Sequence, residues 1–432
     1  MKTRVFWLLI FTLVIAMGCG GASRDDNTLI VWHWMTDRHA AFEELAARYE
    51  AQTGVKVRFE LYAPSDIYSQ KIIAAAQART LPDIFGILDK KKVVAAFIES
   101  GFVLDLQSYF AADERAWERR LFPKAMSVNR FEAKNSYGIA PGIYGVPIDV
   151  TNIQMIYNKK LLKKAGIAKI PQTFDEFLEM AKLLRIHGIS GLVSGWGEMW
   201  MIDCFASNYA FNIMGQDKVM ATFRGEVPYT DADWIKVLDV FRRLRDAGAL
   251  AQGIVTKANK YAEQDFALGR AAFAFNGSWC VNVYDDMNPD LDYAVMMPPL
   301  VNPQRPMSIW GGAGSSFHVL ATSPNKDMAV AFLKWLTAED QQTFLAERTK
   351  NLPANRYAAK TVHPVLAAFA ANMDHTTHPT IWPVNEQFVV TEVFDKGIQA
   401  IIIGERTPQE VALEVQKVKQ REMEKRRLRA RP

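Results

Sequence analysis

The sequence predicts an α/β fold built from mixed β-sheets flanked by helices. The chain has 432 residues, of which 49% are hydrophobic and 23% charged, as is typical of a folded protein with a large buried core. Strand-like and helix-like segments alternate from residue 28 onward, and an extended stretch with a short polar centre, at residues 145–160, separates two such regions. These observations indicate more than one folded unit, each with strands and helices in alternation.

The alternation is clearest over the first hundred residues. Residues 28–34 (TLIVWHW) are rich in β-branched and aromatic side chains, as expected of a buried strand. Residues 38–52 carry apolar side chains at helical spacing and precede Thr53-Gly54, where glycine favours the end of a helix. The pattern repeats twice, with strands expected at residues 55–61 and from residue 81, and with helices at residues 66–80 and 90–100.

Polar and aromatic side chains follow the first and third of these strands. Ligands of parallel sheets bind beyond the carboxyl ends of the strands, so both turns are expected to face one crevice. Asp83, inside the third strand segment, is interpreted as a structural turn or capping group. The candidate ligand-binding residues of these turns are Trp34, Thr36, Asp37 and Asp89.

The stretch at residues 145–160 (GVPIDVTNIQMIYNKK) is predicted to cross between folded units. Pro147 fixes its own φ and disfavours a helical conformation at the preceding residue, so the chain is extended here. Short polar side chains between two apolar runs suit a crossing segment that also lines a cleft, although an ordinary loop between strands has the same pattern. The candidate ligand-binding residues of the crossing are Asp149, Thr151 and Asn152.

The N-terminus has the features of an export signal. Two basic residues precede an apolar run at residues 5–17, which is too short to cross a bilayer comfortably and is followed by Gly18-Cys19. These residues resemble a bacterial lipobox, which predicts removal of residues 1–18, lipid attachment to Cys19 and a polar tether at residues 19–27. A plain signal peptide with an incidental cysteine is the alternative.

Positive charge is concentrated at the two ends of the chain. Removing residues 1–18 takes away Lys2 and Arg4 and lowers the formal charge from +4 to +2. Residues 419–432 hold seven basic and two acidic residues, a net charge of +5, so the folded body is close to neutral. This distribution gives no indication of nucleic-acid binding. We expect residues 419–432 to form a solvated tail, which could also touch anionic lipid.

Five segments carry a family resemblance. They are AFEELAARYEAQTGVKVRFEL with LPDIFGI, the crossing stretch, LLKKAGIAKIPQTFDEFLEMAKLL, FALGRAAFAFNGSW, and WGGAGSSFHVLATSPNKDMAVAFLKWLTAEDQQTFL. In the third segment, Thr173 and Glu176 have the spacing of a helix capping box. In order and spacing, over about residues 28–415, the segments resemble family 1 extracellular solute-binding proteins, the maltose-binding-protein-like sugar receptors of bacterial ABC importers.

The resemblance implies a periplasmic-binding-protein-like fold of two lobes joined by hinge strands near residues 145–152, 311–315 and 369–383. Lobe 1 would comprise residues 28–148 plus 313–370, lobe 2 residues 149–312 plus 371–418, and residues 419–432 the basic tail. It further implies an exported, lipid-anchored monomer that captures a sugar between its lobes and delivers it to permease subunits, facing the periplasm or the cell exterior, without catalysis and without a cofactor.

Sugar binding requires flat aromatic faces and polar groups that donate and accept in pairs. Four tryptophans (Trp32, Trp117, Trp234 and Trp335) lie in strand or helix patterns and are interpreted as structural. Other tryptophans lie beside glycine, proline or polar residues at expected turns and hinges. With their polar neighbours, the further candidates are Trp196, Glu198, Trp200, Asn276, Trp279, Trp310, Gly311, Gly312 and Trp382.

Other functions are less well supported by the residues. His375, His378 and Glu386 could be arranged around zinc, but a loop of hydrogen-bonded histidines fits better, so no metal site is predicted. Cys204 and Cys280 could form a disulfide or remain two buried thiols. A polyamine, a choline-like cation or glycerol phosphate remains an alternative ligand. An exported carbohydrate-active enzyme using Asp149 or Glu198 remains an alternative of another class.

Overall fold

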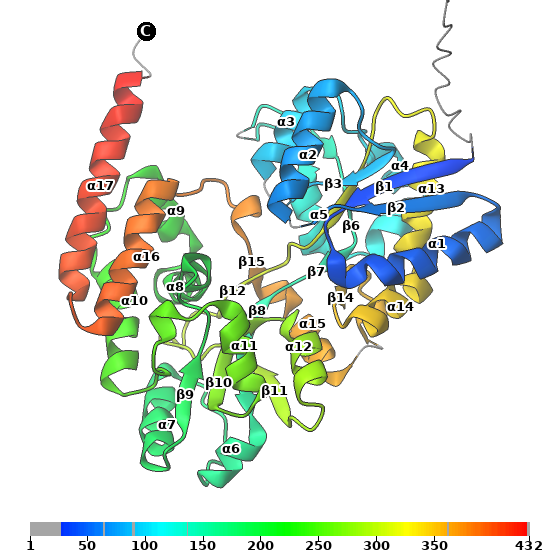
Figure 1. Cartoon of the computed structure of the whole chain (residues 1–432). Coiled ribbons are helices and arrows are strands. Elements are labelled where there is room, and N and C mark those ends of the chain that lie inside the picture. Colours follow the sequence, from blue (N-terminus) through cyan, green and yellow to red (C-terminus); the bar gives the residue numbers. More distant parts are fainter. Residues whose placement is uncertain (1–26, 64, 89–90, 136, 361–362, 430–432) are drawn as a thin grey trace, which may run out of the picture.

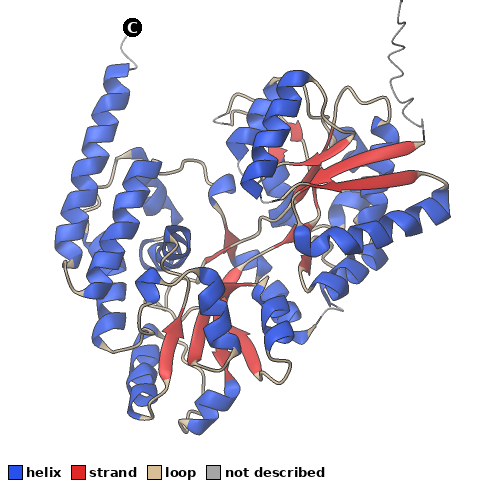
Figure 2. Ribbon diagram, in the orientation of Figure 1, coloured by secondary structure: helices blue, strands red, loops and turns tan. Residues whose placement is uncertain are grey.

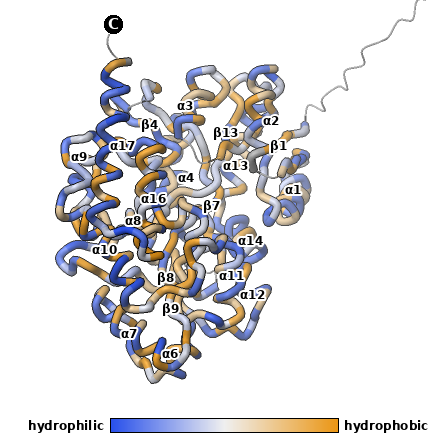
Figure 3. Tube along the Cα trace, turned by 60° about the vertical axis from the view of Figure 1, so that its left-hand side comes forward, coloured by the Kyte–Doolittle hydropathy of each residue, from blue (hydrophilic) through white to orange (hydrophobic). Residues whose placement is uncertain are grey.

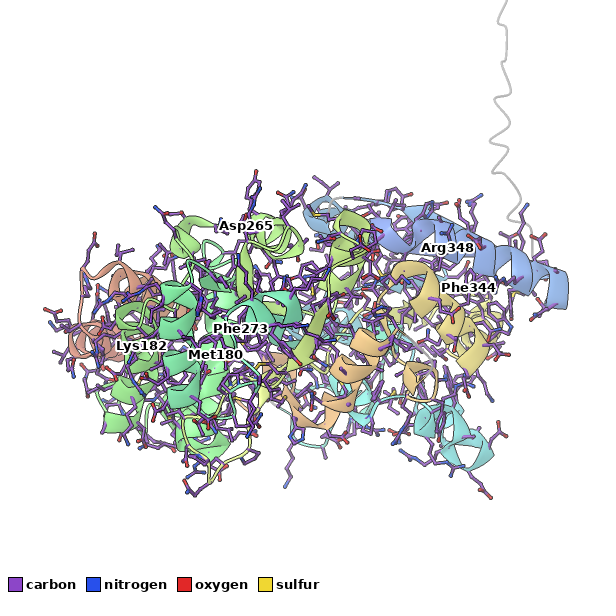
Figure 4. All side chains as sticks on the ribbon, turned by 90° about the horizontal axis from the view of Figure 1, so that it is seen from below. Met180, Lys182, Asp265, Phe273, Phe344 and Arg348 are labelled. Atoms are coloured by element: carbon purple, nitrogen blue, oxygen red, sulfur yellow. The ribbon has the colours of Figure 1, made fainter. Side chains whose placement is uncertain are left out.

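A computed structural model describes residues 27–63, 65–88, 91–135, 137–360 and 363–429. These residues form two α/β lobes, each with a central sheet flanked by helices, and extended segments connect the lobes (Figures 1 and 2). Seen from below, the lobes lie side by side, with Phe273 in one and Phe344 in the other (Figure 4). The two-lobe α/β prediction is confirmed. The predicted signal peptide, Cys19 and Asp89 lie outside the described residues.

Lobe 1 is built on a five-stranded mixed sheet with the strand order β2-β1-β3-β13-β6. β1 pairs in parallel with β2 and β3, whereas β13 is antiparallel to β3 and β6. The side chains of β1 are almost all buried because helices cover both faces of the sheet. The strands are β1 (Thr28–His33), β2 (Lys56–Leu61), β3 (Ile84–Gly86), β6 (Val146–Pro147) and β13 (Ser316–Val319).

The helices of lobe 1 come from two separate stretches of the chain, residues 39–129 and residues 326–349. Gly54 ends α1 in a left-handed conformation with φ of 75°, as the sequence predicts. Asp83 is fully buried and accepts hydrogen bonds from the Ile30 N–H and the Ser323 hydroxyl, in agreement with its structural interpretation. The helices are α1 (His39–Thr53), α2 (Ser65–Ala78), α3 (Lys91–Glu99), α4 (Gln107–Arg119), α5 (Pro123–Asn129), α13 (Lys326–Leu336) and α14 (Glu339–Thr349).

Lobe 2 is built on a four-stranded mixed sheet with the order β11-β8-β10-β9. The predicted capping box is present, because Thr173 accepts from the Glu176 N–H and Glu176 accepts from the Thr173 N–H. The strands are β8 (Ile153–Asn158), β9 (Ser190–Val193), β10 (Ala271–Gly277) and β11 (Tyr293–Met296). The helices are α6 (Lys159–Lys164), α7 (Phe174–Ile186), α8 (Met199–Met214), α9 (Gln216–Arg224), α10 (Ala232–Asp246), α11 (Asn259–Ala267), α12 (Cys280–Met287) and α16 (Phe388–Ile403).

Short strands and single turns make the connections between the lobes. α15 belongs to a hydrophobic cluster that contains residues of both lobes, so this connection is broader than one strand, and the lobe boundaries stay a prediction. The remaining elements are β4 (Arg130–Phe131), β5 (Gly142–Ile143), β7 (Asp149–Val150), β12 (Ile309–Trp310), β14 (Leu352–Pro353), α15 (Pro364–Ala371) and β15 (Thr376–Thr377). The 3₁₀ turns are η1 (Thr36–Arg38), η2 (Ile254–Thr256), η3 (Ala358–Lys360), η4 (Met373–His375) and η5 (Pro379–Ile381).

The C-terminal region differs from the expected tail. α17 (Pro408–Arg429) is one continuous helix that runs beyond the predicted boundary at residue 419. It packs beside α16 and α10 on the outside of lobe 2 (Figure 1). The sequence predicts the helix only to Lys419 because the later residues lack apolar side chains at helical spacing. Within the described part of the chain, no helix is long and apolar enough to cross a bilayer. Cys204 and Cys280 are free, buried thiols.

Candidate functional site

The crossing between the lobes is held by backbone pairing. The Ile148 N–H donates to the Ser315 oxygen at 2.8 Å, and the Thr151 N–H donates to the Ala313 oxygen at 3.0 Å. A third segment joins them, because the Gly311 N–H donates to the Thr377 oxygen at 2.9 Å. The three predicted hinge regions therefore meet in one hydrogen-bonded set of strands.

Asp149 lies in this hinge and is 3% exposed. Its carboxylate forms an ion pair with Arg38, at the end of η1, and accepts from the Ser315 N–H at 2.7 Å. Arg38 also donates to the Ser315 hydroxyl at 3.1 Å. Burial raises the pKa of Asp149, while Arg38 and the Ser315 N–H oppose that rise. This Arg38–Asp149–Ser315 cluster ties both crossings to lobe 1, so Asp149 has a structural partner rather than a free carboxylate.

Thr151 and Asn152 are also engaged within the hinge. The Thr151 hydroxyl donates to the Ala313 oxygen, and the Asn152 amide, which is fully buried, donates to the Phe369 oxygen at 2.9 Å. Gly311 lies against Thr151 and Asn152 so closely that a Cβ would collide with them, and Gly312 has φ of 88°. Both glycines are therefore required by the packing of the hinge strands.

The turn after β1 presents an aromatic surface in lobe 1. Trp34 is half-buried, and its ring lies directly over Gly86 at the end of β3, where a side chain would collide with it. The ring of Tyr68 is 5.3 Å from that of Trp34, and its hydroxyl donates to the Trp32 and Gly86 oxygens. The turns after the first and third strands thus meet, as predicted.

Two predicted residues of lobe 1 are exposed beside this surface. Thr36 and Asp37 both lie in η1 and reach the solvent. Asp37 accepts from the Asn351 amide at 2.9 Å and lies 3.3 Å from the Arg38 guanidinium. They are accessible polar groups next to the hinge.

Lobe 2 contributes a pair of tryptophans. Trp200, at the start of α8, is 45% exposed, and its ring centroid lies 6.1 Å from that of Trp279, which follows β10. The Trp200 N–H donates to the Glu198 carboxylate at 2.8 Å. The other Glu198 oxygen accepts from the Asn259 N–H at 2.7 Å. Trp196, from the same segment, is instead fully buried in the core against Phe205 and Phe241, because α8 and α10 cover it.

Glu263 of α11 organises this region and has no place in the sequence prediction. One of its oxygens accepts from the Trp279 N–H at 3.0 Å, the Asn276 amide at 3.1 Å and the Asn259 amide at 2.8 Å. Burial raises the pKa of Glu263, and the three donors counteract that rise. The Trp279 ring lies over Gly277, where a side chain would collide with it. The one sequence signal is the four-residue spacing of Asn259 and Glu263 on a helix face.

A second aromatic group lies where β12 and β15 pair. The Trp382 N–H donates to the Thr377 hydroxyl at 2.6 Å, and its ring centroid lies 5.9 Å from that of Trp310. The His378 ring packs against Trp310 at 5.2 Å, and Phe211 against Trp382 at 5.3 Å. Both tryptophans are half-buried, so they combine support of the hinge with partial exposure.

The hinge places the two lobes' aromatic groups on either side of one segment. Arg38, four residues after Trp34, contacts Asp149, whereas the Ser278 N–H, next to Trp279, donates to the Asn152 oxygen at 2.9 Å. Arg38 of lobe 1 and Ser278 of lobe 2, which lie close in sequence to Trp34 and Trp279, therefore bind residues 149–152 from opposite lobes. Such an arrangement can hold a small solute with apolar faces and polar edges. Among the described residues, no group of three metal-ligating side chains occurs.

Comparisons with known proteins identify a family and relatives with the same fold. A family model for bacterial extracellular solute-binding proteins matches residues 32–343. The diacetylchitobiose binding protein DasA of Streptomyces coelicolor is 24% identical over 366 residues, which is 79% of this chain and 79% of DasA. The melibiose/raffinose/stachyose-binding protein MelE of Bacillus subtilis is 20% identical over 368 residues, 82% of this chain and 81% of MelE. The solved apo-form of RafE from Streptococcus pneumoniae has a TM-score of 0.73 at 16% identity, covering 90% of this chain and 96% of RafE.

Proposed function

This chain belongs to the bacterial extracellular solute-binding proteins, and from that premise we propose that it is the substrate-binding component of an ABC-type carbohydrate importer. The observation that carries the proposal is the Trp200–Trp279 pair beside the hinge, with each indole N–H held by a carboxylate. Fixed indole rings offer flat apolar faces against which the C–H faces of a sugar can stack.

The hydrogen bonds of the site favour a neutral ligand over a cation. One Glu263 oxygen already accepts from three donors, and each Glu198 oxygen accepts from one. These neutral donors leave the carboxylate charges in place, but they occupy lone pairs that an ammonium group would need for direct hydrogen bonds. Carbohydrate specificity also agrees with relatives whose names refer to diacetylchitobiose and to melibiose, raffinose and stachyose.

In the proposed mechanism, the ligand first binds the tryptophans and polar groups of lobe 2. Rotation about the strands at residues 148–152 and 311–315 then brings Trp34, Thr36 and Asp37 of lobe 1 against it. The closed form delivers the ligand to permease subunits, and no bond in the ligand is broken. Asp149 and Asn152 act in the hinge and Trp196 in the core, rather than as ligand contacts.

We further propose that the protein is exported as a monomer and held at the membrane by lipid on Cys19. The lipobox-like sequence at residues 16–19 and the polar residues 20–27 support this. Metabolic labelling with a radioactive fatty acid tests it. The wild-type chain should be labelled and the Cys19→Ser variant should not, whereas label in both would contradict it.

Titration calorimetry against mono-, di- and oligosaccharides, with choline and putrescine in parallel, tests the carbohydrate assignment. We expect heat and saturable binding for at least one sugar and none for the two cations. Small-angle scattering should show a smaller radius of gyration with that sugar. Binding of a cation alone, or no binding and no compaction with any sugar, would overturn the assignment. Hydrolysis of the bound sugar would instead indicate an enzyme.

A further inference from the structure

The C-terminal end of α17 is a basic helix that the proposed function does not use. The last eight residues, KRRLRARP, contain five basic and no acidic residues. The first half of the helix packs on lobe 2 through a buried face, whereas Lys425, Arg426 and Arg427 are exposed. Figure 3 shows the helix as a largely hydrophilic tube whose upper end stands clear of the lobe. The charge is therefore presented to the surroundings.

Buried contacts fix the direction of this helix. Lys419 is 2% exposed, and its ammonium donates to both oxygens of Glu386 at 2.7 and 2.8 Å and to the Phe223 oxygen at 2.7 Å. The Tyr229 hydroxyl donates to the same carboxylate at 3.0 Å. Four residues further along, Met423 packs against Gly225, where a Cβ would collide with it. The end of α17 is thus a continuation of a firmly held helix and not a frayed tail.

Two of the three exposed cations at this end form no ion pair with another described residue. Lys425 pairs with Glu422, but no ion pair is formed by Arg426 or Arg427 within the described residues. Leu428 beside them is 54% exposed. The helix dipole favours cations at this end, but the like charges on these consecutive residues repel one another, and an anionic partner would relieve that repulsion. Arginine is well suited to phosphate because its planar guanidinium donates two parallel hydrogen bonds.

The position of the helix end points to a surface as the partner. In Figure 1 the C-terminal end of α17 lies at the top of lobe 2, and β1 begins at the right-hand side of lobe 1, in the upper half of the molecule. A planar anionic surface facing the upper side of the molecule would meet the end of α17, and the nine residues 19–27, which span at most about 30 Å when extended, could link β1 to the same surface. A compact anionic ligand would need cations converging on one pocket, whereas Arg426 and Arg427 lie on successive positions of an open helix end.

We propose that the C-terminal end of α17 binds the anionic phospholipid surface of the membrane. Arg426 and Arg427, with Lys425, pair with lipid phosphates, and Leu428 enters the interface between head groups and acyl chains. The binding orients the protein on the membrane through a second point of contact. It does not depend on lipid at Cys19 or on which solute the protein carries.

Vesicle co-sedimentation with the chain from Gly20 onward, which keeps the whole folded body and carries no lipid, tests this. The protein should sediment with phosphatidylglycerol-containing vesicles, much less with pure phosphatidylcholine, and less as salt is raised. The triple variant K425Q/R426Q/R427Q should bind the anionic vesicles roughly 100-fold less, at about fivefold for each charge removed.

The control variant K163Q/K164Q/K169Q removes the same charge from exposed lysines at and after α6, on the opposite edge of the molecule (Figure 1). It should bind vesicles as the unmodified chain does. No vesicle binding, equal losses in both triple variants, or binding to duplex DNA but not to anionic vesicles would each overturn the proposal. Sugar affinity, measured on the same samples, should be equal in all variants. A failure of vesicle binding is therefore distinguishable from a failure of the carbohydrate assignment.

Discussion

Both lobes pack a tryptophan against a glycine, but the hydrogen bonds around the two tryptophans differ. In each, a tryptophan that follows a strand packs closely against a strand-end glycine: Trp34 against Gly86 in lobe 1 and Trp279 against Gly277 in lobe 2. In lobe 1 the neighbouring hydroxyl of Tyr68 donates only to backbone oxygens. In lobe 2 the indole N–H groups donate to carboxylates, with further amides bound to the same oxygens.

This difference indicates a division of labour. Lobe 2 has the directional polar groups that can select a ligand, and hydrogen bonds among these groups hold them in place. Lobe 1 has an aromatic face with two exposed polar residues, Thr36 and Asp37, that can close over a bound ligand. The predictions that follow separate these roles.

The largest effect is expected at the link between lobe 1 and the hinge. Arg38→Ala leaves the Asp149 carboxylate buried without its ion pair, so the free energy of unfolding should fall by about 3–5 kcal/mol. Arg58→Ala, which removes an exposed ion pair with Glu60 in the same lobe, should cost less than about 1 kcal/mol. Urea denaturation followed by circular dichroism measures both. Equal losses would show that the Arg38–Asp149–Ser315 cluster is not the link.

The tryptophans of the two lobes should differ in their contribution to ligand affinity. Trp279→Ala should weaken binding by about 2–3 kcal/mol, because the variant loses both the indole face that stacks on the sugar and the N–H that Glu263 holds. Trp34→Ala should cost about 1 kcal/mol, since lobe 1 contacts the ligand only on closure. Calorimetry with the best sugar measures both, with Trp335→Phe of α13 as the control. A larger loss for Trp34 would reverse the proposed division of labour.

The lobe interiors should also respond to pH in opposite directions. In lobe 2, burial raises the pKa of Asp203 on α8 to about 7, and burial together with Asp203 raises the pKa of Asp395. In lobe 1, burial, with His39 and Arg38, lowers the pKa of His33 to about 3, and burial lowers that of His318 to about 4.

The folded state binds the acid protons more tightly than the unfolded state, so the contribution of Asp203 to stability is complete below about pH 4 and is lost as the pH rises towards 7. The histidines contribute fully above about pH 6.5, and their contribution is lost as the pH falls towards 4 and 3. Asp203→Asn should therefore raise the free energy of unfolding by roughly 2 kcal/mol at pH 8 and leave it nearly unchanged at pH 4. Thermal unfolding at both pH values measures this, and an equal gain at both would contradict it.

The sequence was informative where local patterns decide the structure. The strand from Thr28, the capping box at Thr173 and the end of α1 at Gly54 all follow from periodicity and capping, and all are confirmed. The crossing at residues 145–152 is likewise extended and hydrogen-bonded to the second crossing.

What the sequence could not provide is the partner of each polar group. Asp149 is a residue type expected at a ligand contact. Its partner Arg38 is 111 positions away in the sequence, so no local pattern reveals the ion pair. Trp196 and Trp200 lie in one short segment, yet one is buried and the other exposed, because α8 and α10 cover only the first. Glu263 was missed because it sits inside an ordinary helix pattern.

The smallest effect is expected at Glu263 itself. Glu263→Gln keeps an oxygen that can accept from the Trp279 N–H, but it removes the negative charge that strengthens this bond and those from Asn259 and Asn276. Sugar affinity should fall by about 1 kcal/mol, mainly through a less firmly held Trp279 ring. Glu60→Gln on β2 of lobe 1, where the carboxylate accepts from the Tyr62 hydroxyl at 2.7 Å, makes the same chemical change at an aromatic donor just after that strand. That control should bind the sugar as the unmodified chain does. A loss of the same size in both variants would mean that charge anywhere on the protein affects binding. If Glu263→Gln causes no loss of sugar affinity, packing against Gly277 alone positions Trp279. The two lobes would then hold their tryptophans in the same way.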